Sequence, residues 1–507
     1  MQKVIVLTGA SGNMGREVLN ELYTLPDVKI RILNYDDKRF GRLVKRKYAG
    51  VETVEGNIAD ESVCKILVGG ADYVINCAAV IPPKSDKYPE KAFECNYYGV
   101  KSLIDAVKSC KPEPKLIHVS TVALYGNRNY LHPWGRVGDP LMPSVYDVYA
   151  KSKLFGERLV LESGIEKWAV LRQTAMLHDR MLADNMSDGL MFHTCLNSPL
   201  EWVTAKDSGL LIKNIVEKDI NNEAEGFWRK VYDIGGGEKN RNTGYDTFND
   251  GFAIIGGSAK QFLLPEWHAD RNFHGVWFYD GDGLENEFRY QRQDCSDYWR
   301  EILKKRPYYA IAKAIPSGII KKFAVERLLN NYNAPKKWQK NGEEGKLRAY
   351  FYSDKRICGW ENFPLLREGK TPSGEIDYNN IKDKKCAERL LLSHGFDENK
   401  GEKEITVEDL KQAAAFRGGK CLSEKYTGDW YVPLEWECAD GHRFFASPYT
   451  VLFGGHWCEE CLKNGWDYDN MARKSEFFAQ VYYDSHDKNE RRFYYFKNGA
   501  AEYEEIV

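Results

Sequence analysis

The sequence predicts an α/β fold with a doubly wound parallel sheet, and three observations lead to this prediction. The apolar run at residues 4–7 is followed at once by a glycine-rich turn and then by helix-like sequence. Short apolar runs then alternate with helix-like stretches as far as about residue 233. Such alternation is typical of a parallel sheet covered by helices on both faces. A chain of 507 residues also exceeds one compact unit, so at least two domains are expected.

The predicted elements follow this alternation in order. A first strand at residues 3–7 precedes a helix that begins near Met14. Later strands are recognised as short apolar runs between turns, and helices as longer stretches. The strands lie at residues 29–33, 73–76, 115–119, 168–171 and 231–233, and the helices at residues 100–107 and around 149–153.

The alternation ends near residue 235, where the sequence becomes rich in aromatic residues. We predict an irregular substrate region, mostly at residues 175–205 and 240–335, which completes a first domain over residues 1–335. This region either caps a substrate cleft or forms a satellite core against the sheet. Residues 336–404 are expected to be a linker and helical connector, and residues 405–507 a small zinc-binding domain with an acidic tail.

The glycine-rich turn at residues 8–15, Thr-Gly-Ala-Ser-Gly-Asn-Met-Gly, predicts a dinucleotide site. A buried strand must turn sharply there into a helix whose first N–H groups point at a pyrophosphate. Side chains at the three glycine positions would block that approach. The predicted cofactor contacts in this turn are Gly9, Ser11, Gly12, Asn13, Met14 and Gly15.

Tyr149 and Lys153 form a Tyr-x-x-x-Lys pair further along the chain. Residues four apart lie on one face of a helix, so we expect the Lys153 ammonium beside Tyr149 and within reach of the cofactor ribose. A free phenol has a pKa near ~10, and a neighbouring cation stabilises its phenolate. The pair therefore predicts a proton shuttle that works together with hydride transfer at a nicotinamide.

Five motifs occur in an order that resembles the extended short-chain dehydrogenases/reductases, the NAD-dependent epimerase/dehydratase family. They are the glycine turn, Asn-Cys-Ala-Ala at 76–79, Asn-Tyr-Tyr-Gly-Val-Lys-Ser-Leu at 96–103, Val-Ser-Thr-Val-Ala-Leu-Tyr-Gly at 119–126, and the Tyr-Lys pair. The resemblance covers about the first 235 residues. It implies that Thr121 hydrogen-bonds the substrate oxygen and that Asn96 supports the active-site strand and a proton-relay water. The cofactor contacts that it implies are Ala78, Ala79, Asn57 and Ile58, the last two at the adenine.

The choice of cofactor depends on the end of the second strand. An Asp or Glu there would bind both ribose hydroxyls and repel a 2′-phosphate, but this sequence has Asn34. Basic residues at 38, 39 and 42 favour a phosphate, whereas acidic residues at 36 and 37 oppose it. We expect NAD(P) as the cofactor, with a slight preference for NADP(H).

Two departures from the family pattern narrow the range of reactions that we expect. Dehydratases carry an acid pair directly after the active-site threonine, where this chain has Val122 and Ala123. Nucleotide-sugar enzymes tend to continue the sixth strand as Arg-x-x-Asn, and here Ala175 replaces the asparagine. We therefore expect an NAD(P)-dependent oxidoreductase that interconverts a hydroxyl and a carbonyl on a small or medium organic substrate. Two alternatives are a nucleotide-sugar epimerase, which needs the same side chains, and a dinucleotide-sensing regulator that binds protein or nucleic acid.

Two cysteine-rich segments near the end of the chain have the spacing of tetrahedral zinc ligands. The predicted ligands are Cys438, His442, Cys458 and Cys461. Their surroundings resemble treble-clef or zinc-ribbon modules over about residues 405–465, and Cys421 and His456 are alternative ligands with a poorer spacing. Four protein ligands leave no open position, so the predicted zinc is structural. The acidic tail opposes contact with nucleic acid, so protein interaction or homo-oligomerisation is at least as well supported.

Composition adds expectations about the compartment. The net charge of −2 provides no global basic field for a polyanion. No apolar stretch approaches the length that spans a bilayer, and the chain begins in a strand, so we expect a cytoplasmic protein. The twelve cysteines are accordingly expected to be reduced.

Residues 307–329 interleave basic residues with apolar ones. This pattern is open to two interpretations. The segment lies on a membrane surface, or it is a docked helix that shows its charges to water. From the sequence we favour the docked helix.

Overall fold

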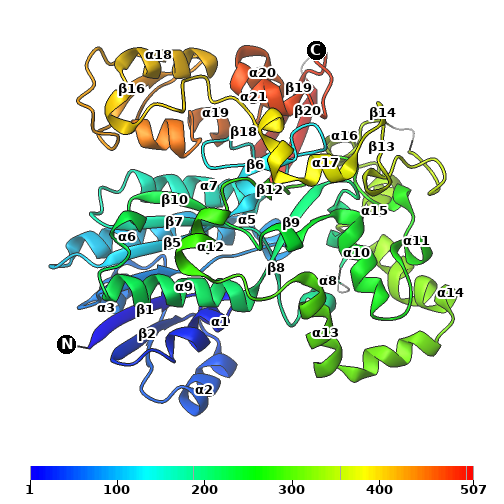
Figure 1. The fold of residues 1–507 in the computed structure, drawn as a ribbon, viewed down its shortest axis with the longest axis horizontal. Helices are drawn as coiled ribbons and strands as arrows, with labels where there is room; N and C mark the ends of the chain where they lie inside the picture. The colour runs from blue at the N-terminus through cyan, green and yellow to red at the C-terminus, as the bar shows by residue number, and fades with distance from the viewer. Residues whose placement is uncertain (1, 186–187, 354–355, 498–499, 506–507) are drawn as a thin grey trace.

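The computed structural model describes residues 2–185, 188–353, 356–497 and 500–505, and it confirms the doubly wound parallel sheet (Figure 1). Seven parallel strands lie in the order β10-β7-β5-β4-β1-β2-β3. The order reverses between β1 and β4, and in such sheets ligands bind beyond the carboxyl ends of the strands at this point. The strands are β1 (Lys3–Thr8), β2 (Val28–Asn34), β3 (Glu52–Glu55), β4 (Tyr73–Asn76), β5 (Lys115–Thr121), β7 (Trp168–Gln173) and β10 (Lys230–Ile234).

Helices cover both faces of the sheet because its strands are apolar on both sides. In β1, for example, Ile5 and Leu7 pack into the core on one face and Val6 into the core on the other. The first face carries α1 (Asn13–Leu22), α2 (Lys38–Lys47) and α9 (Ala205–Ile220). The second carries α3 (Glu61–Val68), α6 (Gly99–Ser109) and α7 (Val148–Leu161).

Most predicted strands are present, with ends that differ by one to a few residues. β5 and β7 run two residues further than predicted, to Thr121 and Gln173. β3 was not predicted, because its sequence Glu-Thr-Val-Glu lies at the sheet edge and has no fully buried residue.

The aromatic-rich region surrounds a second sheet of three strands, which lies beside the main sheet in Figure 1. Phe192, Phe262 and Trp267 are buried in a core of this region, while Trp202 and Phe248 line a large cavity. The region therefore acts both as a satellite core and as a cavity wall. Its elements are β6 (Trp134–Gly135), β8 (Ala175–Leu177), α8 (Met181–Asn185), β9 (Pro199–Thr204), β11 (Arg241–Thr243), α10 (Gly244–Ala253), α11 (Ala259–Phe262), β12 (Trp277–Phe278), α12 (Asp282–Phe288) and α13 (Cys295–Lys305).

The docked helix that we favoured at residues 307–329 is wrong for the first part of this segment. The 3₁₀ helix η7 (Pro307–Ala314) and α14 (Ser317–Ile320) contain no buried residue. The later part is buried through Val325, Leu328 and Leu329, and Tyr309 and Ile320 of the earlier part pack against neighbouring cores while partly exposed. The periodicity of the sequence indicated an apolar face but not whether that face meets the protein.

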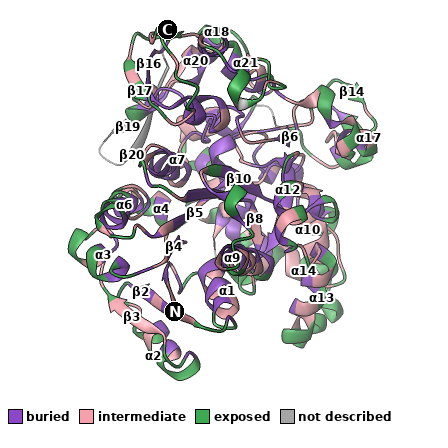
Figure 2. Ribbon diagram, turned by 60° about the vertical axis from the view of Figure 1, so that its left-hand side comes forward, coloured by how far each residue is buried: buried purple, intermediate pink, exposed green. Residues whose placement is uncertain are grey.

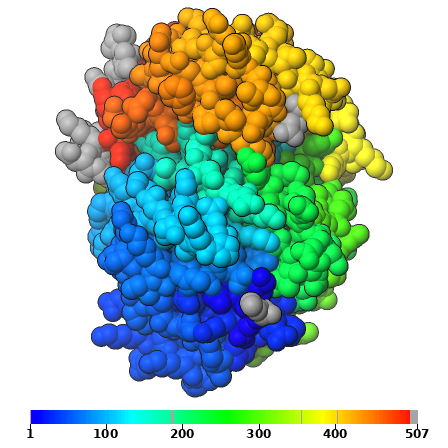
Figure 3. All heavy atoms as spheres, turned by 90° about the vertical axis from the view of Figure 1, so that its left-hand side faces the viewer, coloured from blue at the N-terminus to red at the C-terminus, as the bar shows by residue number. Residues whose placement is uncertain are grey.

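Residues 336–404 form short elements, and the remainder of the chain forms a module that packs on α7. Figure 3 shows this C-terminal module, in orange, directly above the blue and cyan N-terminal region. The connecting elements are α15 (Pro335–Asn341), α16 (Glu344–Tyr350), β13 (Lys370–Thr371), β14 (Gly374–Glu375) and α17 (Tyr378–Lys382). The module contains α18 (Val407–Phe416), β15 (Lys420–Cys421), β16 (Leu434–Glu437), β17 (Arg443–Ala446), α19 (Glu460–Lys463), β18 (Gly465–Trp466), α20 (Tyr468–Lys474), α21 (Glu476–Tyr482), β19 (Arg492–Lys497) and β20 (Ala500–Glu505).

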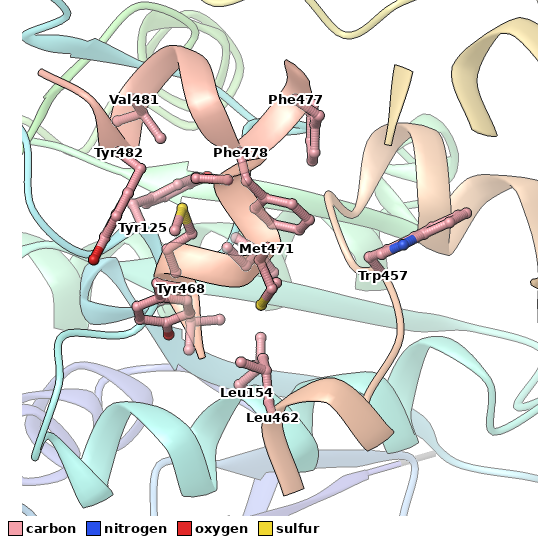
Figure 4. Packing of buried hydrophobic residues seen from close by; sticks show 14 of the residues in the cluster. Tyr125, Leu154, Trp457, Leu462, Tyr468, Met471, Phe477, Phe478, Val481 and Tyr482 are labelled. Atoms are coloured by element: carbon pink, nitrogen blue, oxygen red, sulfur yellow. The ribbon is translucent and has the colours of Figure 1, made fainter. Parts of the chain in front are cut away.

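One hydrophobic core joins the C-terminal module to the N-terminal region. Leu154 of α7 faces Leu462 and Met471 of the module in Figure 4, with Phe478 beyond them. The predicted acidic tail pairs as β19 and β20 instead of extending into solvent, although its residues 506–507 lie outside the described part of the chain. Within the described ranges, no helix has both the length and the hydropathy needed to cross a bilayer.

Candidate active site and metal centre

The turn between β1 and α1 has the backbone geometry of an anion site. Gly9 has a φ of +69°, and a Cβ on it would lie 2.6 Å from the carbonyl carbon of Cys77. A Cβ on Gly15 would lie 2.1 Å from the Gly9 oxygen. α1 begins at Asn13 with no side-chain cap and no acidic residue in its first turn. Its first N–H groups are therefore available to an anion such as a pyrophosphate.

A cavity of about 360 Å³ is lined by residues 11–13 of this turn. Arg16, Arg180 and Lys206 line the same cavity together with Glu17, Asp179 and Glu301, so its lining carries both signs of charge and the anion donors are the backbone N–H groups of the turn. The Met14 side chain, by contrast, is buried in the core behind the turn. The residues present therefore fit a dinucleotide phosphate, with the backbone as the main donor.

The ends of β2 and β3 meet at Asn34 and Glu55. The Asn34 side-chain nitrogen donates to Glu55 Oε2 at 2.8 Å. Asn34 Oδ1 is buried and has no hydrogen-bond partner among the described residues. Asp37 caps α2 by accepting from the N–H groups of Arg39 and Phe40. The structure thus adds Glu55, an exposed carboxylate that the sequence analysis missed, to this end of the site.

The other residues expected at the cofactor lie at the neighbouring strand ends. Asn57 donates to Glu94 Oε1 at 2.7 Å, and Ile58 is buried against α3 and α6. The Ala78 N–H donates to Thr8 Oγ1 at 3.2 Å, and Ala79 is exposed. These positions border the switch point of the sheet.

Tyr149 lies in the first turn of α7, whose N-cap Asp147 accepts from the Ala150 N–H at 2.8 Å. The hydroxyls of Tyr149 and Thr121, the last residue of β5, share a hydrogen bond. Burial raises the pKa of the Tyr149 phenol to about 12, and the bond to Thr121 opposes this rise. Tyr149 by itself is therefore a protonated acid at neutral pH, and its use as a base needs a neighbouring cation.

Lys153 is anchored to the sheet one turn further along α7. Its Nζ donates to Val119 O at 2.6 Å and lies 3.2 Å from His118 Nε2. Among the described residues, no hydrogen bond joins Lys153 to Tyr149, unlike the contact that the helix spacing predicts. An ammonium has three donors, so one remains for a ribose hydroxyl or the phenol. Burial lowers the pKa of Lys153 to about 8.

His118 belongs to a buried polar chain that the sequence analysis missed. Its Nδ1 lies 3.0 Å from Asn76 Nδ2, and Asn76 Oδ1 accepts from Thr8 Oγ1 at 2.6 Å. Burial, followed by the charge of Lys153, holds the pKa of His118 well below its usual value, so its ring is neutral. The sequence did offer a signal for this role, because His118 stands in the middle of the otherwise apolar strand sequence Leu-Ile-His-Val.

Asn96 has a structural role close to the site. Its side chain accepts from the Val80 N–H at 2.9 Å and donates to Val80 O at 3.0 Å and to Ser152 Oγ at 2.9 Å. Asn96 lies in a single π-helical turn, Glu94–Tyr98, directly before α6. It thereby ties the loop after β4 to α7.

A second cavity, of about 810 Å³, is lined by residues 144 and 146–148, directly before Tyr149. His178 lines this cavity and also the 360 Å³ cavity, so the two meet at this side chain. The Nδ1 atom of His178 is buried without a partner among the described residues. The sequence analysis missed this position. The walls combine aromatic side chains (Trp202, Phe248, Phe273, Trp338 and Tyr350) with the charged groups of Asp86, Lys87 and Lys346.

The four predicted metal ligands lie together in the C-terminal module. All four ligand atoms are within 4.8 Å of one another. His442 Nδ1 is 3.4 Å from Cys438 Sγ, 3.7 Å from Cys458 Sγ and 3.5 Å from Cys461 Sγ. Zinc bound tetrahedrally at about 2.3 Å from sulfur separates its ligands by about 3.5–3.8 Å, so the donor set fits zinc.

The alternative ligands have other partners. His456 Nε2 lies 3.0 Å from Glu157 Oε1 of α7, and Cys421 Sγ is directed to Ser423 O at 3.9 Å. The metal ligands Cys438 and His442 flank the turn between β16 and β17, and Cys461 lies in α19. A hairpin, the loop before α19 and α19 itself thus supply the four side chains.

Comparison with known proteins identifies the class of the N-terminal region. Residues 5–170 match the model of the NAD dependent epimerase/dehydratase family. This region therefore resembles that family of extended short-chain dehydrogenases/reductases. The match covers less than half of the chain, and it does not include the aromatic-rich region or the C-terminal module.

Two curated relatives match the same part of the chain. The dTDP-4-dehydrorhamnose reductase of Mycolicibacterium smegmatis is 27% identical over 171 residues, which are 34% of this chain and 45% of the relative. A 3 beta-hydroxysteroid dehydrogenase/Delta 5-->4-isomerase of Mycobacterium tuberculosis is 25% identical over 171 residues, 32% of this chain and 43% of the relative. The chain thus spans less than half the length of these relatives.

Solved structures resemble the larger part of the chain. The dTDP-glucose 4,6-dehydratase DesIV of Streptomyces venezuelae, with NAD and TYD bound, is 19% identical and aligns with a TM-score of 0.49 over 60% of this chain and 98% of its own. The UDP-glucuronic acid 4-epimerase of Bacillus cereus, in complex with UDP-glucuronic acid and NAD, is 19% identical with a TM-score of 0.47 over 60% and 99%.

Proposed function

We propose that this protein is an NAD(P)-dependent oxidoreductase that interconverts a hydroxyl and a carbonyl on a small or medium organic substrate. The observation that carries the proposal is the hydrogen-bonded pair of Thr121 and Tyr149, with Lys153 anchored on the same helix. The pair stands near the switch point of a sheet whose first turn is shaped for a dinucleotide. Two cavities meet at His178, and the larger is lined by residues directly before Tyr149, although Thr121, Tyr149 and Lys153 themselves line neither.

The side chains divide the proton chemistry among them. In oxidation, the substrate hydroxyl gives its proton to the Tyr149 phenolate while the carbon-bound hydrogen leaves as hydride; reduction reverses both transfers. Thr121 holds the substrate oxygen beside the phenol. The Lys153 ammonium stabilises the phenolate and donates to the ribose, because its other two hydrogen bonds hold it in place. The bound nicotinamide supplies hydride acceptance and donation.

Elimination of water lacks its acid at this site. The positions after Thr121 are Val122 and Ala123, both buried and apolar. Epimerisation is the second candidate, since it uses the same three residues and needs space for a keto intermediate to turn. The 810 Å³ cavity supports that alternative. A dinucleotide-sensing regulator is less well supported, because the Thr, Tyr and Lys side chains are all present.

For the cofactor we propose NAD(H) rather than the NADP(H) that the sequence slightly favoured. The Glu55 carboxylate is fixed to Asn34 at the end of β2, where a 2′-phosphate of NADP would add negative charge. The unpartnered Asn34 Oδ1 is an acceptor, which suits a ribose hydroxyl and not a phosphate oxygen. For the Cys/His cluster we propose a structural zinc ion.

Replacing Tyr149 by Phe tests the proposed function. The Tyr149→Phe variant should lose at least about 100-fold in turnover, since it lacks the proton donor and acceptor. Its affinity for NAD(H), measured by fluorescence titration, should remain nearly unchanged. Turnover is measured by nicotinamide absorbance in a screen of sugars, nucleotide sugars, steroids and small ketones. Unchanged turnover in the variant would refute the role of Tyr149.

A further inference from the structure

An apolar stripe lies exposed on the segment that follows α13. Its members recur every three or four residues, which is the spacing of one helical face. Their exposed fractions are Tyr308 58%, Ile311 68%, Ile315 42%, Ile319 48% and Phe323 67%. We call residues 304–323 the basic ridge.

No residue in the described part of the chain buries the five side chains of the stripe. Neither η7 nor α14 contains a buried residue, and residues 313–319 are all exposed. In Figure 1, α14 lies at the margin of the molecule beyond α11 and α13, and Figure 2 shows the same part at the periphery, largely green and pink. Scattered exposed apolar residues are ordinary in proteins, but five within residues 308–323 mark an interaction surface.

The charge of the segment shows what kind of partner fits. Residues 302–325 contain six Lys or Arg and no Asp or Glu, in a chain whose net charge is −2. Lys305 is paired with Asp179 and Glu301. Lys304, Lys313 and Lys322 are exposed and form no ion pair among the described residues. An apolar stripe flanked by unpaired cations matches the interface of a bilayer with anionic headgroups.

We propose that the basic ridge docks this protein onto an anionic lipid surface, with Ile311, Ile319 and Phe323 entering the headgroup boundary and the lysines binding lipid charges. The ridge is too short and interrupted by Pro316 to span a bilayer, so the attachment is peripheral.

Vesicle sedimentation of the full chain tests the proposal. Vesicles of phosphatidylcholine alone are compared with vesicles that contain about one third phosphatidylserine. The wild-type protein should bind the anionic vesicles at least about tenfold more strongly, and 0.5 M salt should abolish most of the difference. Equal binding to both vesicles, or to neither, would overturn the proposal.

Two variants separate the apolar and charged contributions. Ile311→Glu/Phe323→Glu and Lys313→Gln/Lys322→Gln should each lower binding to anionic vesicles at least about fivefold. The matched control is Ile66→Glu, since Ile66 is 67% exposed and its helix α3 lies on the opposite side of the view from α14 in Figure 1, so this variant should bind as wild type.

Two further measurements test whether the variants fold and whether the ridge binds a second copy of the chain instead of lipid. Unchanged circular dichroism and thermal midpoint confirm that the variants fold. A wild-type dimer in size-exclusion chromatography that Ile311→Glu/Phe323→Glu converts to monomer, without vesicle binding by the wild type, would assign the ridge to a contact between copies and refute the lipid proposal. Neither readout depends on catalytic activity.

Discussion

Single residues at the end of β5 decide how Lys153 is held. The buried chain from Thr8 through Asn76 and His118 reaches the lysine amine, and Val119 O fixes a second bond. The Val119 carbonyl oxygen accepts from the ammonium and favours its charged form, against the burial that lowers the pKa of Lys153 to about 8. His118 is thus a positioning residue for the lysine.

Replacing His118 by Phe should weaken the charged state of Lys153. Lys153 is protonated below its pKa, so activity that needs the cation falls as pH rises through about 8. Because Phe removes a polar neighbour from an ammonium whose burial already lowers its pKa, that pKa should drop further, and the alkaline loss of kcat should begin about one pH unit lower. The measurement is kcat against pH. His118→Gln, which keeps a polar side chain, should resemble the wild type, and an unshifted profile in the Phe variant would contradict this role.

A second residue-scale prediction concerns the cofactor. Glu55→Gln removes the negative charge beside Asn34 and keeps a side chain of the same shape. The ratio of NADP to NAD affinity should rise about fivefold, because a 2′-phosphate no longer meets a carboxylate. Titration with both nicotinamide dinucleotides measures this ratio. Glu61→Gln, in the first turn of α3, is the control, and an unchanged ratio for Glu55→Gln would argue against our choice of NAD.

Among the elements, α7 carries the site on one side and the C-terminal module on the other. Twelve of its fourteen residues are buried, and Figure 2 shows the helix in purple between the sheet and the module. Glu157 of α7 pairs with Arg172 at 2.6 Å and with His456 of the module at 3.0 Å. Burial opposes the ionisation of Glu157, but Arg172 and His456 hold its pKa well below the usual range. Arg158 adds bonds to the carbonyl oxygens of Trp457 and Phe445.

Glu157→Gln should therefore destabilise the whole protein. The change leaves Arg172 buried without its counter-charge, which costs about 3 kcal/mol. Denaturant unfolding followed by circular dichroism measures the loss. Glu166→Gln, at an exposed position just after α7, should leave stability within about 0.5 kcal/mol of the wild type. Equal stability of the two variants would show that the pair contributes little.

At the scale of the whole molecule, the Cys/His cluster lies in the C-terminal module, which packs against α7. Trp457 and His456, which contact α7, directly precede the ligand Cys458. Loss of the metal should therefore loosen the support of α7 as well as the module itself. We therefore propose that this metal site is structural and that its removal would act on activity indirectly.

Metal analysis of the purified protein tests this link. The wild type should hold about one zinc per chain, and Cys458→Ser should hold little and show lower kcat together with a lower thermal midpoint. Cys358→Ser, at an exposed cysteine outside the cluster, should keep its zinc and its activity. Negligible metal in both the wild type and Cys458→Ser would rule out the zinc site.

Some parts of the fold and of the site could be predicted from the sequence and others could not, for physical reasons. Strands such as β1 and β5 were predicted because strands buried on both faces are continuous apolar runs, whereas the edge strand β3 lacked that pattern. The metal ligands were predicted because zinc knuckles are local in sequence. Glu55, His118 and His178 were missed because their roles come from neighbours on other strands or from the meeting of two cavities.

The sequence by itself determined the parallel α/β class, the glycine turn for a dinucleotide, and the identity of the Thr, Tyr, Lys and Cys/His groups. These features depend on short-range spacing, which is written along the chain. Only the tertiary structure decided that the C-terminal module packs on α7, that Lys153 is held by His118 and Val119, and that the basic ridge faces outward. Burial and long-range pairing set these outcomes, because a residue's environment is made by segments far from it in sequence.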